Sequence, residues 1–207
     1  IPIGAGLSSS AALCVAIVMC SQNNIGPMEI SLEAQRIENH VLRSNCGLMD
    51  QISITHSKEG LATLLDFSRM NIESFRMPDD WRFKLVDTGI RRSLSETNYS
   101  SSEIKIETRR IHAKEESARV RTALSSDAKS LGTILNESHA SISDNIRTST
   151  PEIDNMVKEI QSTAGVLGAR LMGGGFGGMI LALVEEEDTL PGDLLVSSAP
   201  AFLQETL

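Results

Sequence analysis

The feature that most restricts the fold is the start of the chain, IPIGAGLSSSAALCVAIVMC, where a turn rich in glycine and serine runs directly into an uncharged segment. Residues 10–22 place apolar side chains on every face of a helix, a pattern typical of a helix buried on all sides. The backbone amides at a buried helix start cannot be satisfied cheaply by water. The pattern therefore predicts either an anion site at this helix start or a simple serine N-cap.

The residue types in this turn suit phosphate chemistry. Gly4 and Gly6 would let the backbone approach a ligand closely. The hydroxyls of Ser8, Ser9 and Ser10 could hold phosphate oxygens or a hard cation.

A second glycine run, GGGFGG at 173–178, lies near the other end of the chain. The strand-like segment MILALV follows it, whereas a dinucleotide-binding fingerprint needs a helix after its glycines. Residues 169–172 before the run are also strand-like, so we predict a tight connection in an antiparallel sheet. Close approach of the backbone to a ligand remains an equal alternative.

Between these runs the sequence predicts alternating groups of helices and strands. A helix at 29–43 has an apolar stripe formed by Ile30, Ala34, Ile37 and Val41, with Glu38 at the edge of the core. Residues 47–55 fit either a helix or a strand. Strands are predicted at 61–67, 72–77 and 83–87, solvated helices within 96–126, and further helices at 128–145 and 152–164, the last one capped by Thr150.

Charge and cysteine content exclude several classes of function. The formal net charge is −8 and no basic stripe is visible, which argues against nucleic-acid binding. Three cysteines without a CxxC pair support neither a zinc site nor a disulfide framework. No apolar run approaches the roughly 20 residues that span a bilayer, so we expect a soluble protein. The cysteine content favours a cytoplasmic protein with reduced thiols. The negative charge makes a small-molecule ligand the expected partner.

Three further side chains are candidates for chemistry. Asp50 lies among apolar neighbours in NCGLMDQIS, so its carboxylate is expected to pair with a cation, cap a helix or handle a proton. Glu38 could be an acid at the edge of the surface, and Tyr99, the only tyrosine, could serve packing or capping. The four histidines show no metal-ligand spacing such as HExxH.

Taken together, four motifs in this order resemble the GHMP family of small-molecule kinases and, within it, the galactokinases. The motifs are IPIGAGLSSSAA, CGLMDQ, VDTGIRRSLSETNY and GGGFGG, and the second and third point to the galactokinase branch. The resemblance implies an α+β fold of two domains, with a mixed sheet and helices in the N-terminal part and an antiparallel sheet and helices in the C-terminal part. Residues 1–78 would be the remainder of the N-terminal domain and 79–207 the C-terminal domain.

The resemblance also implies the cofactors ATP and Mg²⁺, the substrate galactose and a role for each matching residue. Asp50 would orient or deprotonate the anomeric hydroxyl, and Gly47, Asp50 and Tyr99 would contact the sugar. Ser10, or Ser9, would hold the magnesium ion together with Glu38. The ATP phosphates would bind to Gly4, Gly6, Leu7, Ser8, Ser9, Ser10 and Ala11. The late run that would support this loop is Gly173, Gly174, Gly175, Phe176, Gly177 and Gly178.

Two departures from the family pattern are visible. The family's N-terminal motif, with an arginine near the transferred phosphate and acidic and histidine contacts to the sugar, has no counterpart here, so we expect a fragment with little turnover alone. The basic pair Arg109–Arg110 also follows Tyr99 later than expected. A related sugar kinase such as an N-acetylgalactosamine kinase, a non-catalytic sensor of galactose and ATP, and an unrelated α+β domain remain alternatives, and the sequence gives no oligomeric state.

Overall fold

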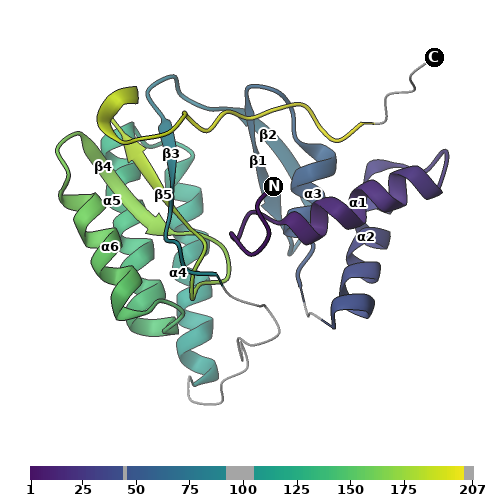
Figure 1. Ribbon diagram of the computed structural model, residues 1–207, viewed down its shortest axis with the longest axis horizontal. Helices are drawn as coiled ribbons and strands as arrows, with labels where there is room; N and C mark the ends of the chain where they lie inside the picture. The colour runs from purple at the N-terminus through teal and green to yellow at the C-terminus, as the bar shows by residue number, and fades with distance from the viewer. Residues whose placement is uncertain (44–45, 92–104, 203–207) are drawn as a thin grey trace. The chain divides into compact units, whose positions relative to one another are not determined.

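The computed structural model describes residues 1–43, 46–91 and 105–202 (Figure 1). The chain forms two compact units. The N-terminal unit comprises Ile1–Ile3, Ser8–Met77 and Val196–Leu207, and the C-terminal unit comprises Gly4–Leu7 and Pro78–Leu195. The assignment of 1–78 and 79–207 to separate family domains stays a prediction.

The N-terminal unit contains three helices and a hairpin. The helices are α1 (Ser9–Ser21), α2 (Pro27–Leu42) and α3 (Met49–His56), and the strands are β1 (Leu61–Asp66) and β2 (Asn71–Arg76) (Figure 1). Residues 47–55, which fit either type of element in the sequence, contribute mainly to α3. The two strands pair antiparallel, with Leu61 opposite Arg76, so both predicted strands of this unit are confirmed.

The helices of this unit pack through one face each. Buried Cys14, Val15 and Val18 of α1 contact Ala34 of α2. The expectation that α1 is buried on all sides is wrong for the described residues, because Leu13 is 63% exposed. Apolar periodicity identifies a helix but does not say which of its faces a neighbour covers.

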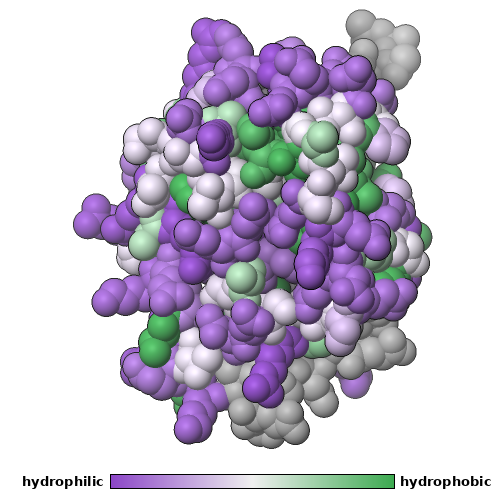
Figure 2. All heavy atoms as spheres, turned by 90° about the vertical axis from the view of Figure 1, so that its left-hand side faces the viewer, coloured by the Kyte–Doolittle hydropathy of each residue, from purple (hydrophilic) through white to green (hydrophobic). Residues whose placement is uncertain are grey.

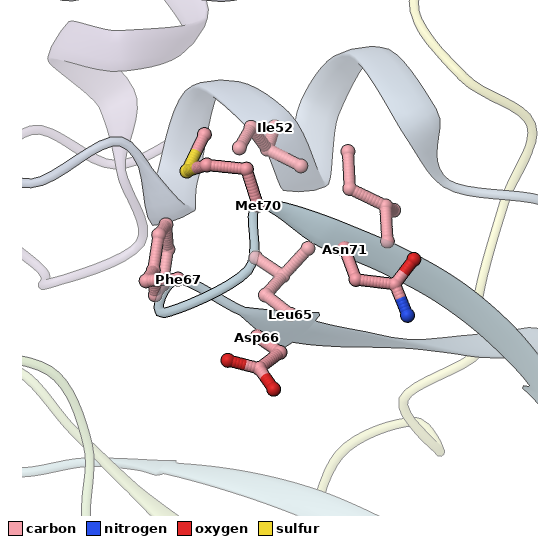
Figure 3. A pocket seen from close by; sticks show the side chains of 7 residues that line it. Ile52, Leu65, Asp66, Phe67, Met70 and Asn71 are labelled. Atoms are coloured by element: carbon pink, nitrogen blue, oxygen red, sulfur yellow. The ribbon is translucent and has the colours of Figure 1, made fainter.

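Helix α3 and the hairpin are joined by a small apolar cluster. Figure 3 shows Ile52 of α3 lying over Leu65 and Met70 of the hairpin, with Phe67 beside them. Met70 has a positive φ of 49° at the turn. These side chains fill the space between them, so the cluster holds the hairpin and is no ligand site.

The C-terminal unit contains a three-stranded antiparallel sheet and its helices (Figure 1). The strand order is β3-β5-β4, so the two strands that flank the glycine run are neighbours, as the sequence predicts. The elements in chain order are β3 (Arg82–Asp87), α4 (Ile106–Ala123), α5 (Ala128–Ser141), the π-helix η1 (Ile142–Ile146), α6 (Pro151–Ser162), β4 (Val166–Leu171), β5 (Met179–Val184) and the 3₁₀ helix η2 (Glu187–Thr189).

Two apolar clusters form the core of this unit. Ile180 and Ala182 of β5 join a cluster with α6, whereas Leu183 joins one with α5. This alternation follows from the two-residue period of a strand. Thr150 caps α6 by accepting a hydrogen bond from the Ile153 amide at 3.4 Å, which confirms the predicted cap.

Helix α4 of the C-terminal unit is solvated. No described residue of α4 is buried, in agreement with the predicted solvated helices in this part of the chain. Figure 2 looks onto the side on which α5 and α6 lie in Figure 1, and the surface there is mostly hydrophilic.

Candidate functional site

The first turn of α1 lacks the serine cap that was one alternative for the opening motif. Ser8 occupies the N-cap position with a left-handed backbone (φ 56°, ψ 34°), and its side chain makes no capping hydrogen bond. A non-glycine residue adopts this conformation rarely. The amides of this helix start are therefore not satisfied by the Ser8 side chain, and the positive end of the helix is open to an anion.

A buried carboxylate lies beside this helix start, within the same unit. Ser10 Oγ donates a hydrogen bond of 2.6 Å to Glu38 Oε1. Gln51 Nε2 donates one of 2.7 Å to Glu38 Oε2. Glu38 is only 3% exposed, so the carboxylate lies deeper than the edge position that the helical wheel of α2 predicts.

Glu38 is held by neutral donors alone. The ion pairs formed within the described part of the chain do not include it. A buried carboxylate without a cationic partner is unfavourable. A divalent cation would supply the missing charge, and the Ser10 hydroxyl and the Glu38 carboxylate are oxygen ligands of the kind Mg²⁺ prefers.

The number of carboxylates also suits magnesium. In the described ranges, no three or more His, Cys, Asp or Glu side chains gather as a metal cluster. Mg²⁺ bound with a nucleotide commonly takes only one or two carboxylates and completes its shell with phosphate oxygens and water. The donor set therefore fits a magnesium ion that arrives with phosphates.

The surroundings of Glu38 also affect the pKa of a thiol, that of Cys14. Burial raises the pKa of Cys14, and the charge of Glu38 and the nearby Cys46 raise it further. A thiol with a raised pKa is a poor nucleophile and a poor soft-metal ligand. Cys14 is therefore a packing residue beside this site.

Helix α2 carries a second, polar stripe that the sequence analysis missed. Ser31 Oγ and Thr55 Oγ1 lie 2.6 Å apart, and Gln35 Nε2 donates to the Cys46 carbonyl at 3.0 Å. Asn39 Oδ1 accepts from the Cys46 amide at 2.9 Å. The helical spacing of residues 31, 35, 38 and 39 on one side of α2 could have revealed this stripe.

Asp50 lies in the first turn of α3 and is half-buried. Its carboxylate has no hydrogen-bond or ion-pair partner in the part of the chain that the structure describes, so it is neither a structural pair nor a helix cap there. Gly47, three residues earlier, is exposed and has open space where a Cβ would lie. Tyr99 lies outside the described residues.

The late glycine run packs by its backbone within the C-terminal unit. A Cβ at Gly178 would lie 2.8 Å from the Ala5 carbonyl oxygen, and one at Gly175 would lie 2.1 Å from the Thr148 carbonyl oxygen. The Gly178 amide donates to the Ile90 carbonyl at 3.0 Å. The structure thus brings the run against residues 4–7 of the opening motif, and these contacts leave no space for side chains.

Two family models match the chain. The model of the GHMP kinases N terminal domain matches residues 1–58, and that of the GHMP kinases C terminal matches residues 120–191. Together the two ranges cover more than half of the chain.

Similar folds occur in three solved structures. A galactokinase from Lactococcus lactis, solved with galactose, has a TM-score of 0.81 at 24% identity, and the match covers 97% of this chain and 68% of that one. A mevalonate kinase from L. major, solved with R-mevalonate, has a TM-score of 0.56 at 20% identity, with 90% and 58% covered. A mevalonate kinase from methicillin-resistant Staphylococcus aureus has a TM-score of 0.56 at 21% identity, with 91% and 61% covered.

These identities show a shared fold, and the chain spans 58–68% of the length of the three solved chains. Among the described helices, none combines the length and the apolar character that a membrane span requires.

Proposed function

Because the chain belongs to the GHMP kinase family, we propose that it contributes to an ATP-dependent sugar kinase that phosphorylates the C1 hydroxyl of galactose and yields galactose 1-phosphate and ADP. One observation supports this most strongly. Among the described residues the buried Glu38 carboxylate accepts hydrogen bonds from the neutral donors Ser10 and Gln51, and it fits a magnesium ion that accompanies phosphates.

The proposal assigns the opening motif to the phosphates of ATP. Residues 4–11 would provide backbone amides and the positive end of α1. Ser10 and Glu38 would hold the magnesium ion, which neutralises charge on the phosphates when bound. The glycine run at 173–178 would keep residues 4–7 in place through its backbone contacts.

Asp50 would act on the sugar. Its carboxylate is free of partners within the described residues and would accept a hydrogen bond from the attacking hydroxyl. In phosphoryl transfer the acceptor proton is lost late when the transition state is loose, so Asp50 would contribute chiefly by alignment. Gly47 and Tyr99 would contact the same sugar, and the open space at Gly47 would leave room for it.

The fold does not by itself select the acceptor, because a galactokinase and two mevalonate kinases share it. We therefore propose a panel of galactose, N-acetylgalactosamine and mevalonate, assayed by ADP release with the protein expressed together with any coding sequence that precedes Ile1. Galactose is expected to be the preferred acceptor. Within the described residues Cys14 and Cys20 form no disulfide, which supports a cytoplasmic location.

Loss of the Glu38 charge tests the assignment of the phosphate site. Glu38→Gln should lower turnover by at least about a hundredfold, because the negative charge that would hold the magnesium ion at the phosphates is lost. The exposed Glu59 offers a matched control, and Glu59→Gln should leave turnover unchanged. Equal activity of the two variants in the ADP-release assay would remove Glu38 from the proposed site.

Asp50→Ala tests whether the protein is a kinase or a non-catalytic sensor of galactose and ATP. A kinase loses turnover with this substitution and still binds nucleotide. If the unsubstituted protein, expressed together with any coding sequence that precedes Ile1, binds galactose and ATP by calorimetry but releases no ADP, the sensor is correct and the proposed kinase activity is not.

A further inference from the structure

Gln51 is a buried side chain for which the proposed reaction has no role yet. It lies directly after Asp50 in the first turn of α3 and is 1% exposed. Its amide nitrogen donates to Glu38 Oε2 at 2.7 Å and faces Cys46 Sγ at 3.8 Å. Because an ionised carboxylate only accepts hydrogen bonds, the NH₂ group must point toward Glu38 and the oxygen away from it.

The Gln51 oxygen is left without a partner. Oε1 is fully buried and makes no hydrogen bond to any described residue. Buried polar atoms are nearly always satisfied, so an unpaired acceptor of this kind indicates a donor that binds there. Magnesium retains several of its water molecules in proteins, and such a water carries the donor that this oxygen lacks.

Each oxygen of the Glu38 carboxylate accepts a hydrogen bond from a different side chain, and the two bonds together fix the orientation of the carboxylate. With Ser10 on Oε1 and Gln51 on Oε2, the Glu38 carboxylate cannot rotate without breaking a hydrogen bond in a dry environment. Partners that orient a ligating carboxylate usually change metal affinity by 10- to 100-fold when removed.

We propose that Gln51 is a positioning residue that fixes the Glu38 carboxylate for a divalent cation and joins the helix that carries Asp50 to that cation site. The inference rests on the proposed phosphate and magnesium site and not on the identity of the sugar. Gln51 thereby couples the residue that would align the acceptor to the residues that would hold the phosphates.

A second hydrogen bond between the same two helices provides the control. Ser31 of α2 and Thr55 of α3 lie 2.6 Å apart at their hydroxyls and are both buried. This pair fastens α3 to α2 and does not touch Glu38. Thr55→Val should therefore weaken the helix pair without altering the cation site.

The experiment compares Gln51→Met with Thr55→Val in the full chain, because methionine matches the length of glutamine without its polar atoms. Mn²⁺ affinity is measured by electron paramagnetic resonance with a non-hydrolysable ATP analogue, and the urea midpoint is measured without cation. Gln51→Met should weaken Mn²⁺ binding by about tenfold or more. Thr55→Val should lower the urea midpoint and leave Mn²⁺ affinity within about twofold.

Gln51→Glu gives a second, independent measurement. The substitution brings a second carboxylate against that of Glu38, so the protein without cation should lose stability. Mn²⁺ should then raise the urea midpoint of this variant more than it raises the urea midpoint of the unsubstituted chain. An equal Mn²⁺ effect on both proteins contradicts the proposal.

Different results would overturn the positioning role of Gln51 and the proposed kinase activity. Unchanged Mn²⁺ affinity in Gln51→Met, or no Mn²⁺ binding by the unsubstituted chain, overturns the positioning role. Mn²⁺ binding that depends on Gln51 supports the positioning role, and the sugar kinase alone is overturned if the protein expressed together with any coding sequence that precedes Ile1 phosphorylates no tested acceptor.

Discussion

Two glutamates on α2 show how strongly the surroundings of a residue decide its role. Glu33 pairs with Arg36 at 2.6 Å on the surface, where water screens the two charges and the pair adds little to stability. Glu38, five residues on, is buried between a hydroxyl and an amide. The helical wheel of α2 predicted the side of the helix on which Glu38 lies, but its depth depends on Gln51 of α3, which no pattern within α2 contains.

His139 provides a prediction about pH at the same scale. Burial lowers the pKa of His139, against the opposing charge of Asp154 and with support from Arg170. The unfolded chain therefore takes up a proton near pH 6.5 that the folded chain takes up only at a lower pH. Since the unfolded state binds more protons, the free energy of unfolding should fall as the pH drops below about 6.5.

Urea unfolding of the unsubstituted chain and of His139→Gln at pH 7.5 and 5.5 measures this effect. Glutamine keeps an acceptor for the Leu171 amide, which donates to His139 Nδ1 at 3.4 Å. The half-buried His112 of α4, whose pKa is also lowered by desolvation, is present in both proteins. The unsubstituted chain should lose more stability over this range, and parallel losses would show that His139 does not contribute.

At the scale of elements, α5 and β4 pack closely enough to exclude side chains at two glycines. A Cβ at Gly132 would lie 2.3 Å from the Leu167 carbonyl oxygen, and one at Gly168 would lie 2.1 Å from the Gly132 carbonyl oxygen. The helix and the strand thus touch through their backbones. Neither element shows this from its own sequence, because each glycine lies within an otherwise ordinary helical or strand pattern.

Gly132→Ala should therefore destabilise the chain although alanine favours helices. Propensity contributes a gain of about 1 kcal/mol, whereas forcing a methyl group against backbone costs about 1–3 kcal/mol or more. Thr133→Ala, one residue along α5 on its exposed side, is the control. A urea midpoint for Gly132→Ala at or above that of Thr133→Ala would mean that α5 can shift away from β4 at no cost.

The strands were more predictable than the helix surfaces. The β4 and β5 segments could be predicted because strand-like apolar segments flank a glycine run, an arrangement that favours a tight antiparallel connection. The exposed face of α1 could not, since an uncharged helix has the same sequence whether one face or every face is covered. Residues 47–55 were ambiguous because a short apolar run fits both types of element.

At the scale of the whole molecule, the order of four motifs predicted the family, and the two family models confirm it. The contacts that make a site of these motifs were not predictable in the same way. Gly178 meets Ala5 through backbone atoms from opposite ends of the chain, and such a contact leaves no trace in local periodicity. Motif order thus gave the family, while the depth of Glu38 and the partners of Gln51 required the fold.

Trp81 gives the molecule an optical reporter of its own. It is the only tryptophan of the 207 residues, and its ring meets Phe83 edge to face at 6.4 Å within the α5 cluster. Indole emission therefore reports on the C-terminal unit, whereas circular dichroism averages over all helices. Because each unit has apolar clusters of its own, we expect the urea midpoint measured by tryptophan emission to differ from the one measured by circular dichroism. Coincident midpoints would mean that both units unfold in one cooperative transition.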